Sequence, residues 1–262
     1  TSITACDSLV WNGTTYTQSG AYSYSSGGSN NYSISFDGVD DNIIIQHIND
    51  YSYTQNGLTI QFDIKPYNIN DPSTPSSDYL IWKIDESNGD GLEGRGFDIG
   101  FNNSGLFFRW HQSGNINISS TVYTIDASHL DFSNFQHVSF VTDSNALYAY
   151  VNGIYIGETT LPLNFHALDF GESDIFIGKP EPPLSGYQAP VESEIDNFSI
   201  WNTVLTQQEI QSYMNCHPSG SEAGLVGYWN FEEGSGTTVY DQTSNGNNGT
   251  INGATYDTNV LA

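Results

Sequence analysis

Positively charged residues are scarce in this sequence. Its 262 residues include only 5 Lys and Arg against 30 Asp and Glu, which gives a formal net charge of −25. Binding to nucleic acid requires a basic surface that neutralises phosphates, and binding to an anionic membrane surface requires the same. The composition therefore argues against both kinds of partner. It predicts a strongly acidic, solvated surface, which fits a secreted or cell-surface protein.

Long apolar runs and cysteines are rare as well. No stretch approaches the roughly 20 apolar residues that a membrane-spanning helix needs, so membrane insertion is not expected. The two cysteines, Cys6 and Cys216, are too few for a disulfide framework. They either form one bridge or remain free thiols. No signal peptide is recognisable, and the start at Thr1 looks like a cut from a longer chain, so we expect a part of a larger multidomain protein.

Aromatic residues, in contrast, make up 14% of the chain, which is ample material for one core. Short segments with alternating apolar and polar residues recur between Gly, Asn and Pro, and this period of two is typical of β-strands. In 58–65, for example, Ile60, Phe62 and Ile64 face one way and the polar residues between them face the other. Many such strands predict an all-β sandwich or barrel. The other predicted strands are 32–36, 79–84, 96–100, 106–111, 116–123, 137–141, 147–151, 154–156, 174–178, 195–201 and 225–231.

The chain divides into a short N-terminal segment and one main domain. Residues 1–29 contain a hairpin signal around Asn12-Gly13 and either pack on the main domain or end a preceding module. Residues 30–262 form the main domain, with a single helix predicted over 207–214 behind the N-cap residue Thr206. Residues 224–262 either close this domain or open another repeat. We favour closure, because this segment would cover an exposed sheet edge.

Two acidic segments lie far apart in the sequence, and each lies beside a predicted strand. The first follows Phe36 and the second begins at Glu194. Strict alternation places Glu194 and Asp196 on the same strand face as Phe198 and Ile200. Carboxylates that face a core need a cation or a hydrogen-bond donor. We therefore expect the two segments to share one oxygen-ligand metal site. The alternative is an Asx-rich turn without an ion.

The order and spacing of several weak motifs resemble a laminin-G-like domain of the concanavalin A-like lectin/glucanase superfamily. The resemblance covers 30–262 and implies a jelly-roll β-sandwich of two antiparallel sheets with one short helix. It also implies glycan or protein binding, often with a calcium ion. The motifs lie at 35–41, which contains Phe-Asp-Gly, and at 58–66, 135–138, 150–153, 175–178, 194–202 and 205–210.

From this resemblance and the expected burial, we predict a structural calcium ion. Calcium prefers six to eight oxygen ligands, including backbone carbonyls. The predicted ligands are Asp37, the Gly38 carbonyl, Asp40 and Asp196, with Asp41 and Glu194 as substitutes.

A catalytic interpretation fails on one residue. The start of the 194–202 segment resembles the Glu-x-Asp-x-x-Glu strand of retaining glycoside hydrolases with this jelly roll, where two glutamates act together. Ser199 and Ile200 stand where the second glutamate should be. We therefore expect no enzymatic activity.

All five basic residues lie between 65 and 179. Strict alternation places Lys83 with Tyr79, and Arg109 with His111. We expect Lys65, Tyr79, Lys83, Arg109 and His111 to line one sheet face, the concave one. Such a groove suits uronic or sulfated sugars, through charge-assisted hydrogen bonds and ring stacking. The alternative is that these cations are scattered partners of surface carboxylates.

Taken together, the sequence predicts a non-catalytic, lectin-like module that binds a polysaccharide, an acidic one included. A second hypothesis is a calcium-stabilised structural or protein-interaction module of a large adhesin. A cationic and aromatic face favours the first, whereas a uniformly acidic face favours the second.

Overall fold

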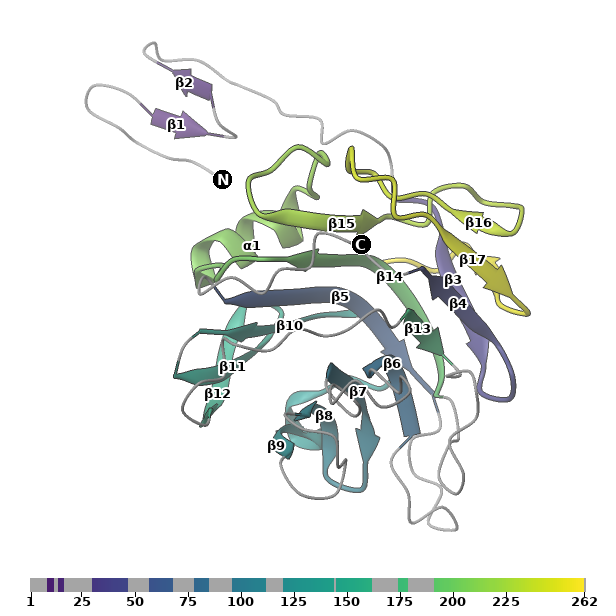
Figure 1. The fold of residues 1–262 in the computed structure, drawn as a ribbon, viewed down its shortest axis with the longest axis horizontal. Coiled ribbons are helices and arrows are strands. Elements are labelled where there is room, and N and C mark those ends of the chain that lie inside the picture. The colour runs from purple at the N-terminus through teal and green to yellow at the C-terminus, as the bar shows by residue number, and fades with distance from the viewer. Residues whose placement is uncertain are drawn as a thin grey trace, which may run out of the picture.

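The computed structural model describes residues 9–11, 14–16, 30–46, 57–67, 78–84, 96–111, 120–143, 145–161, 174–178 and 191–261. They form an all-β jelly-roll sandwich of two antiparallel sheets with one short α-helix, as the sequence predicted (Figure 1). Within these ranges, no helix is long and apolar enough to cross a membrane. The predicted N-terminal hairpin is present as β1 (Leu9–Trp11) paired with β2 (Thr14–Tyr16).

The first sheet has eight strands and carries the helix on its outer face, the face turned away from the other sheet (Figure 1). Its order is β12-β11-β10-β5-β14-β3-β18, and β15 also pairs with β14. The bounds are β3 Ser33–Asp37, β5 Leu58–Pro66, β10 Gln136–Thr142, β11 Ala146–Val151, β12 Ile154–Thr160, β14 Glu192–Trp201, β15 Leu225–Trp229 and β18 Thr255–Asp257.

The second sheet also has eight strands, in the order β16-β17-β4-β13-β6-β7-β8-β9. A 3-10 turn over Ala127–His129 follows its last strand. The bounds are β4 Asn42–Ile45, β6 Asp78–Ile84, β7 Gly96–Asn102, β8 Gly105–His111, β9 Ser120–Asp126, β13 Ile175–Gly178, β16 Thr238–Val239 and β17 Gly249–Asn252. Residues 116–119 of one predicted strand lie outside the described part of the chain.

The core lies between the sheets and is built from alternate residues of the strands. Phe62 and its neighbours Ile60 and Ile64 enter it from β5, as alternation predicted. The second sheet contributes stacked aromatic rings, with Phe97 5.6 Å and Trp110 5.9 Å from the ring of Phe108. Each fully buried side chain of this size stabilises the fold by roughly 1.5–3 kcal/mol. Because side chains alternate along a strand, the residues between these core positions point to the outer faces of the sheets. There a ligand or the helix can contact them.

The helix α1 (Gln207–Asn215) begins in a capping box. Thr206 Oγ1 accepts a hydrogen bond from the Glu209 N–H at 3.3 Å, and Glu209 Oε2 accepts one from the Thr206 N–H at 2.8 Å. The apolar side of α1 then packs on the outer face of the first sheet, with Ile210 buried beside Trp201. The thiol of Cys216, at the end of α1, is free, and Cys6 lies outside the described residues.

The segment after α1 pairs with both sheets of the domain. In the first sheet, β15 pairs with β14 and β18 with β3, and in the second sheet β17 pairs with β4. β18 pairs with β3 on the side away from β14, and β17 pairs with β4 on the side away from β13, so the segment covers both of these edges. Residues from the two ends of the described domain therefore lie side by side, as Figure 1 shows.

Candidate functional site

Three carboxylates meet at the turn between β3 and β4. One ligand oxygen from each of Asp37, Asp40 and Asp41 lies within 4.8 Å of the others. Asp41 Oδ2 accepts the Asp37 N–H at 2.9 Å, and Asp37 Oδ1 accepts the Val39 N–H at 2.8 Å. Burial raises the pKa of Asp41, although the hydrogen bond from Asp37 opposes this. The turn thus has the form of an Asx turn and also leaves carboxylate oxygens that a cation could bind.

Asp196 does not join this acidic turn. In the pairing of β14 with β3, Glu192 stands opposite Asp37, and Asp196 lies four residues further along the strand. At about 3.3 Å per residue, this separation is about 13 Å. Glu194 is also engaged elsewhere, because its carboxylate accepts hydrogen bonds from Tyr67 and Asn259. The predicted ligand set is therefore corrected: the two acidic segments do not form one site.

The orientation predicted for Asp196 is corrected too. A β-bulge between Asp196 and Ser199 resets the alternation of β14 against β5. Asn197 at this bulge has a φ of 50°, which is uncommon for a residue other than Gly. As a result, Phe198 enters the core, whereas Asp196 lies on the outer face opposite Asp63. The carboxylate therefore shares its face with polar residues.

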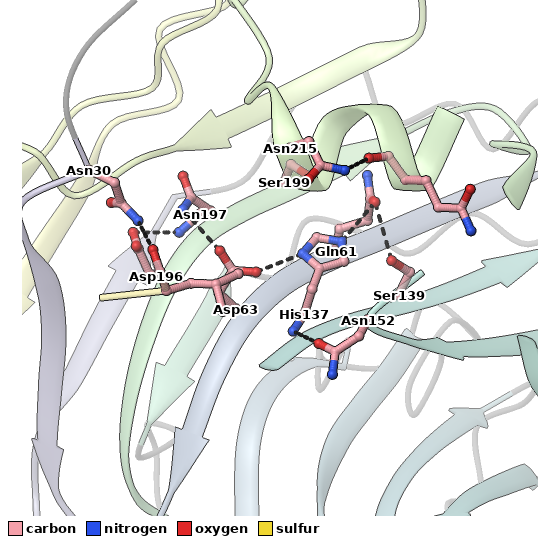
Figure 2. Close-up of polar contacts among 12 residues, drawn as sticks. Asn30, Gln61, Asp63, His137, Ser139, Asn152, Asp196, Asn197, Ser199 and Asn215 are labelled. Carbon is pink, nitrogen blue, oxygen red and sulfur yellow. Dashed lines mark hydrogen bonds and ion pairs between the residues drawn. The ribbon is translucent and has the colours of Figure 1, made fainter. Parts of the chain in front are cut away.

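Figure 2 shows the polar network that Asp196 joins on this outer face. Asp63 is its centre: Asp63 Oδ1 lies 2.6 Å from His137 Nδ1, and Asp63 Oδ2 accepts a hydrogen bond from Asn197 Nδ2 at 3.0 Å. Gln61 Oε1 lies 3.1 Å from His137 Nε2 and accepts a hydrogen bond from Ser139. All five residues are buried. The network joins β5, β10 and β14 and therefore ties three neighbouring strands of the first sheet together.

Asp196 is the most perturbed acid of this network. Its Oδ1 accepts the Asn197 N–H at 2.7 Å, and Asn30 also donates a hydrogen bond to the carboxyl group (Figure 2). Its Oδ2 is buried without a hydrogen-bond partner. Burial, and then the negative charge of Asp63, raise the pKa of Asp196 to about 8. The group therefore holds its proton at neutral pH.

The structure does not place the five predicted ligand residues on one face. Lys65 lies on the outer face of the first sheet, where its Nζ is 3.7 Å from Glu194 Oε2 and 4.9 Å from the ring centre of Tyr67. Lys83 lies opposite Phe97 on the core side of the second sheet and is 1% exposed. A β-bulge between Tyr79 and Ile81 shifts the alternation of β6, so the side chains of Lys83 and Tyr79 point to opposite faces of the sheet. Two further basic residues, Arg95 and Lys179, lie outside the described residues.

The other three predicted residues meet on the outer face of the second sheet, around Asp98. The Asp98 carboxylate accepts hydrogen bonds from Arg109 Nε at 3.0 Å and Nη2 at 2.9 Å, and His111 Nε2 lies 2.5 Å from it. Arg109 Nη2 also donates to the Tyr79 hydroxyl at 3.0 Å. We call Tyr79, Asp98, Arg109 and His111 the Asp98 cluster. Sequence reasoning missed Asp98, although its place between Phe97 and Ile99 already predicts an outward side chain.

Aromatic rings surround the Asp98 cluster. The Arg109 guanidinium lies 5.2 Å from the ring centre of Phe107 and 5.8 Å from that of Tyr79. Trp82 packs edge-on against Tyr79 with ring centres 5.1 Å apart. Burial lowers the pKa of Arg109, but the Asp98 carboxylate outweighs this effect and raises it. The cluster therefore combines charges, hydrogen-bonding groups and apolar rings on one face, where Arg109 is partly exposed and the residues around it are buried.

Comparison with known proteins identifies the family. A family model described as the concanavalin A-like lectin/glucanases superfamily (Laminin_G_3) matches residues 37–211, about two thirds of the chain. No curated protein matches the sequence.

Solved structures share the fold at low identity. A candidate carbohydrate-binding protein from Bacteroides ovatus superposes with a TM-score of 0.64 and 15% identity, covering 88% of this chain and 60% of that one. A heptameric SAP-like pentraxin from Limulus polyphemus gives 0.53 and 14%, covering 87% and 95%. The receptor binding domain of a botulinum neurotoxin mosaic serotype C/D gives 0.51 and 18%, covering 71% and 42%. The chain thus spans less than two thirds of the bacterial protein and less than half of the toxin domain.

Proposed function

Because the chain belongs to the concanavalin A-like lectin/glucanase superfamily, we propose that it is a non-catalytic carbohydrate-binding module of a secreted or cell-surface protein. The observation that carries this proposal is the Asp98 cluster. Sugar sites need hydrogen-bonding groups held in fixed positions beside aromatic rings, and here the partly exposed Arg109 is held by Asp98 beside the rings of Phe107 and Tyr79. The fold shared with the Bacteroides ovatus protein supports the same function.

The proposal of a module without catalysis rests on the 194–202 segment. Ser199 occupies the position of the second glutamate, and its hydroxyl accepts a hydrogen bond from Trp201 Nε1 at 3.1 Å. Glu194, the position of the first, already accepts hydrogen bonds from Tyr67 and Asn259 and pairs with Lys65. A glycosidase mechanism that needs two paired carboxylates therefore lacks its second carboxylate at the position of Ser199.

The proposed ligand is a polysaccharide. Selectivity for an acidic one was expected from a cationic groove, but Lys65 and Arg109 each face a carboxylate and Lys83 is buried. The expectation of an acidic ligand rested on that cationic groove, and the positions of these three residues do not support it.

We further propose that the acidic turn binds a structural calcium ion. Its ligands would be Asp37, the Gly38 carbonyl, Asp40 and Asp41, with Asp41 replacing Asp196 of the original set. The three converging carboxylates and the family resemblance support this assignment. When bound, the ion would offset their mutual repulsion and hold the β3–β4 turn in place.

A glycan array with and without calcium tests the proposed function. The panel holds neutral glucans and galactans together with alginate, sulfated galactans, fucans and chondroitin sulfate. We expect binding by the wild-type protein, a loss of at least tenfold in affinity for Arg109→Gln, and little change for Lys65→Gln, a cation on the other sheet. A protein that is folded and calcium-loaded but binds no member of the panel would contradict this function. It would favour the alternative, a structural or protein-interaction module of a large adhesin.

A further inference from the structure

We propose that the Asp98 cluster selects uncharged sugars and rejects carboxylated or sulfated ones, with Asp98 as the residue that determines this specificity. The inference rests on the proposed function and names the ligand class of the same site. It is carried by the partners of Arg109 and of His111.

The positive charge of Arg109 is neutralised within the cluster. Asp98 is fully buried, and both of its oxygens face the guanidinium, at 2.9 and 3.0 Å. A bidentate pair of this kind is the strongest arrangement that an arginine makes with a carboxylate. The remaining N–H groups of Arg109 can still donate to a hydroxyl. An anionic sugar, however, would have to approach a guanidinium that already has its counter-ion, so it would gain little from the positive charge.

His111 holds Asp98 from the other side. Its Nε2 lies 2.5 Å from Asp98 Oδ2, so the carboxylate has a second partner besides Arg109. His111 is only 4% exposed and Asp98 is fully buried, whereas the Arg109 side chain is 24% exposed. The group of the cluster that a sugar can reach is therefore Arg109, and Asp98 sets its charge balance.

The charge of the whole chain acts in the same direction. The formal net charge is −25, so a polyanion is repelled before it reaches the cluster. At low ionic strength this repulsion extends over tens of ångströms, whereas the contacts within the buried cluster are screened much less. The rejection of charged sugars should therefore weaken with salt without disappearing.

Matched pairs of polysaccharides test the inference. Wild-type protein is titrated with a neutral galactan and its sulfated counterpart, and with a neutral β-glucan and its carboxymethylated derivative, at fixed calcium and at two salt concentrations. We expect the neutral member of a pair to bind at least tenfold more tightly. A charged member that binds as tightly as its neutral partner, or more tightly, overturns the inference and leaves the proposed function standing. Absence of binding to every member by folded protein that binds another glycan of the array overturns the inference alone, whereas absence of binding to the whole array overturns both.

One variant locates the selectivity. Asp98→Asn removes the counter-ion of Arg109, so its ratio of neutral to sulfated binding should fall by at least tenfold. Lys65→Gln is the matched control and should keep the wild-type ratio. An Asp98→Asn protein that is folded by circular dichroism and keeps the wild-type ratio contradicts the role of Asp98. If this variant does not fold, the wild-type comparison decides the ligand class.

Discussion

At the scale of single residues, Asp196 makes folding stability depend on pH. Its pKa of about 8 in the folded protein lies well above the ordinary value of an aspartate, chiefly because the group is buried. Between about pH 4 and pH 8 the folded state keeps a proton that the unfolded state releases. The free energy of unfolding should therefore fall by a few kcal/mol as the pH rises through this window, and should become flat above it.

Asp196→Asn should remove this slope, because the amide does not titrate. We expect the variant to be more stable than the wild type at pH 8 and close to it at pH 4.5, as measured by chemical denaturation at both values. Asp131→Asn is the control. Hydrogen bonds from Asn134 and Ser133 lower the pKa of this exposed carboxyl, so the stability that it contributes is lost as the pH falls, which is the opposite direction to Asp196. A variant of Asp196 that is less stable than the wild type at pH 8 would mean that the carboxylate is ionised and satisfied there.

At the scale of elements, α1 depends on the capping box at its start. Thr206→Ala removes the side-chain acceptor for the Glu209 N–H and should lower the free energy of unfolding by about 1 kcal/mol. Ser212→Ala in the middle of the same helix is the matched control, because its hydroxyl only bonds back to the Gln208 carbonyl and its loss should be neutral. Equal effects of the two substitutions in urea titrations would contradict the role of the cap.

The strands and the helix also show what the sequence could and could not predict. Strand β5 and the helix α1 were predicted almost to their ends, because alternation in the first and capping residues around the second are local signals. The orientations of Lys83 and Asp196 were wrong for one common reason. A bulge precedes Lys83 in β6 and another follows Asp196 in β14, and each shifts the alternation by one residue. Such bulges are set by pairing with a distant strand, which local patterns do not contain.

The meeting of residues from different strands was equally hidden from the sequence. Tyr79, Arg109 and His111 were expected to share a face, and they do, but the residue that holds Arg109 and His111 together is Asp98 on a third strand. Its outward direction could be predicted from the apolar residues on either side. Its contacts could not, because they depend on the order β6-β7-β8 in the second sheet.

At the scale of the whole molecule, self-repulsion should limit stability. With 30 acidic against 5 basic residues, the folded chain concentrates negative charge that the unfolded chain spreads out. Salt reduces the range of this repulsion from about 30 Å at 0.01 M to about 10 Å at 0.1 M. The melting temperature should therefore rise gradually with NaCl, by several degrees up to 0.5 M in scanning calorimetry. A melting temperature that stays constant or falls over this range contradicts the role of self-repulsion.

Calcium should act differently from salt, because the proposed site is local. At matched ionic strength, CaCl2 should add a saturable increase in melting temperature beyond that of NaCl, since an ion that binds only the folded state stabilises it by mass action. Asp40→Asn should abolish this extra increase while keeping the response to NaCl, because it removes one ligand but only one of many charges. Asp131→Asn removes a charge elsewhere and should keep both responses. Equal responses of the wild-type melting temperature to CaCl2 and NaCl would contradict the calcium site and would leave the acidic turn as an Asx turn without an ion.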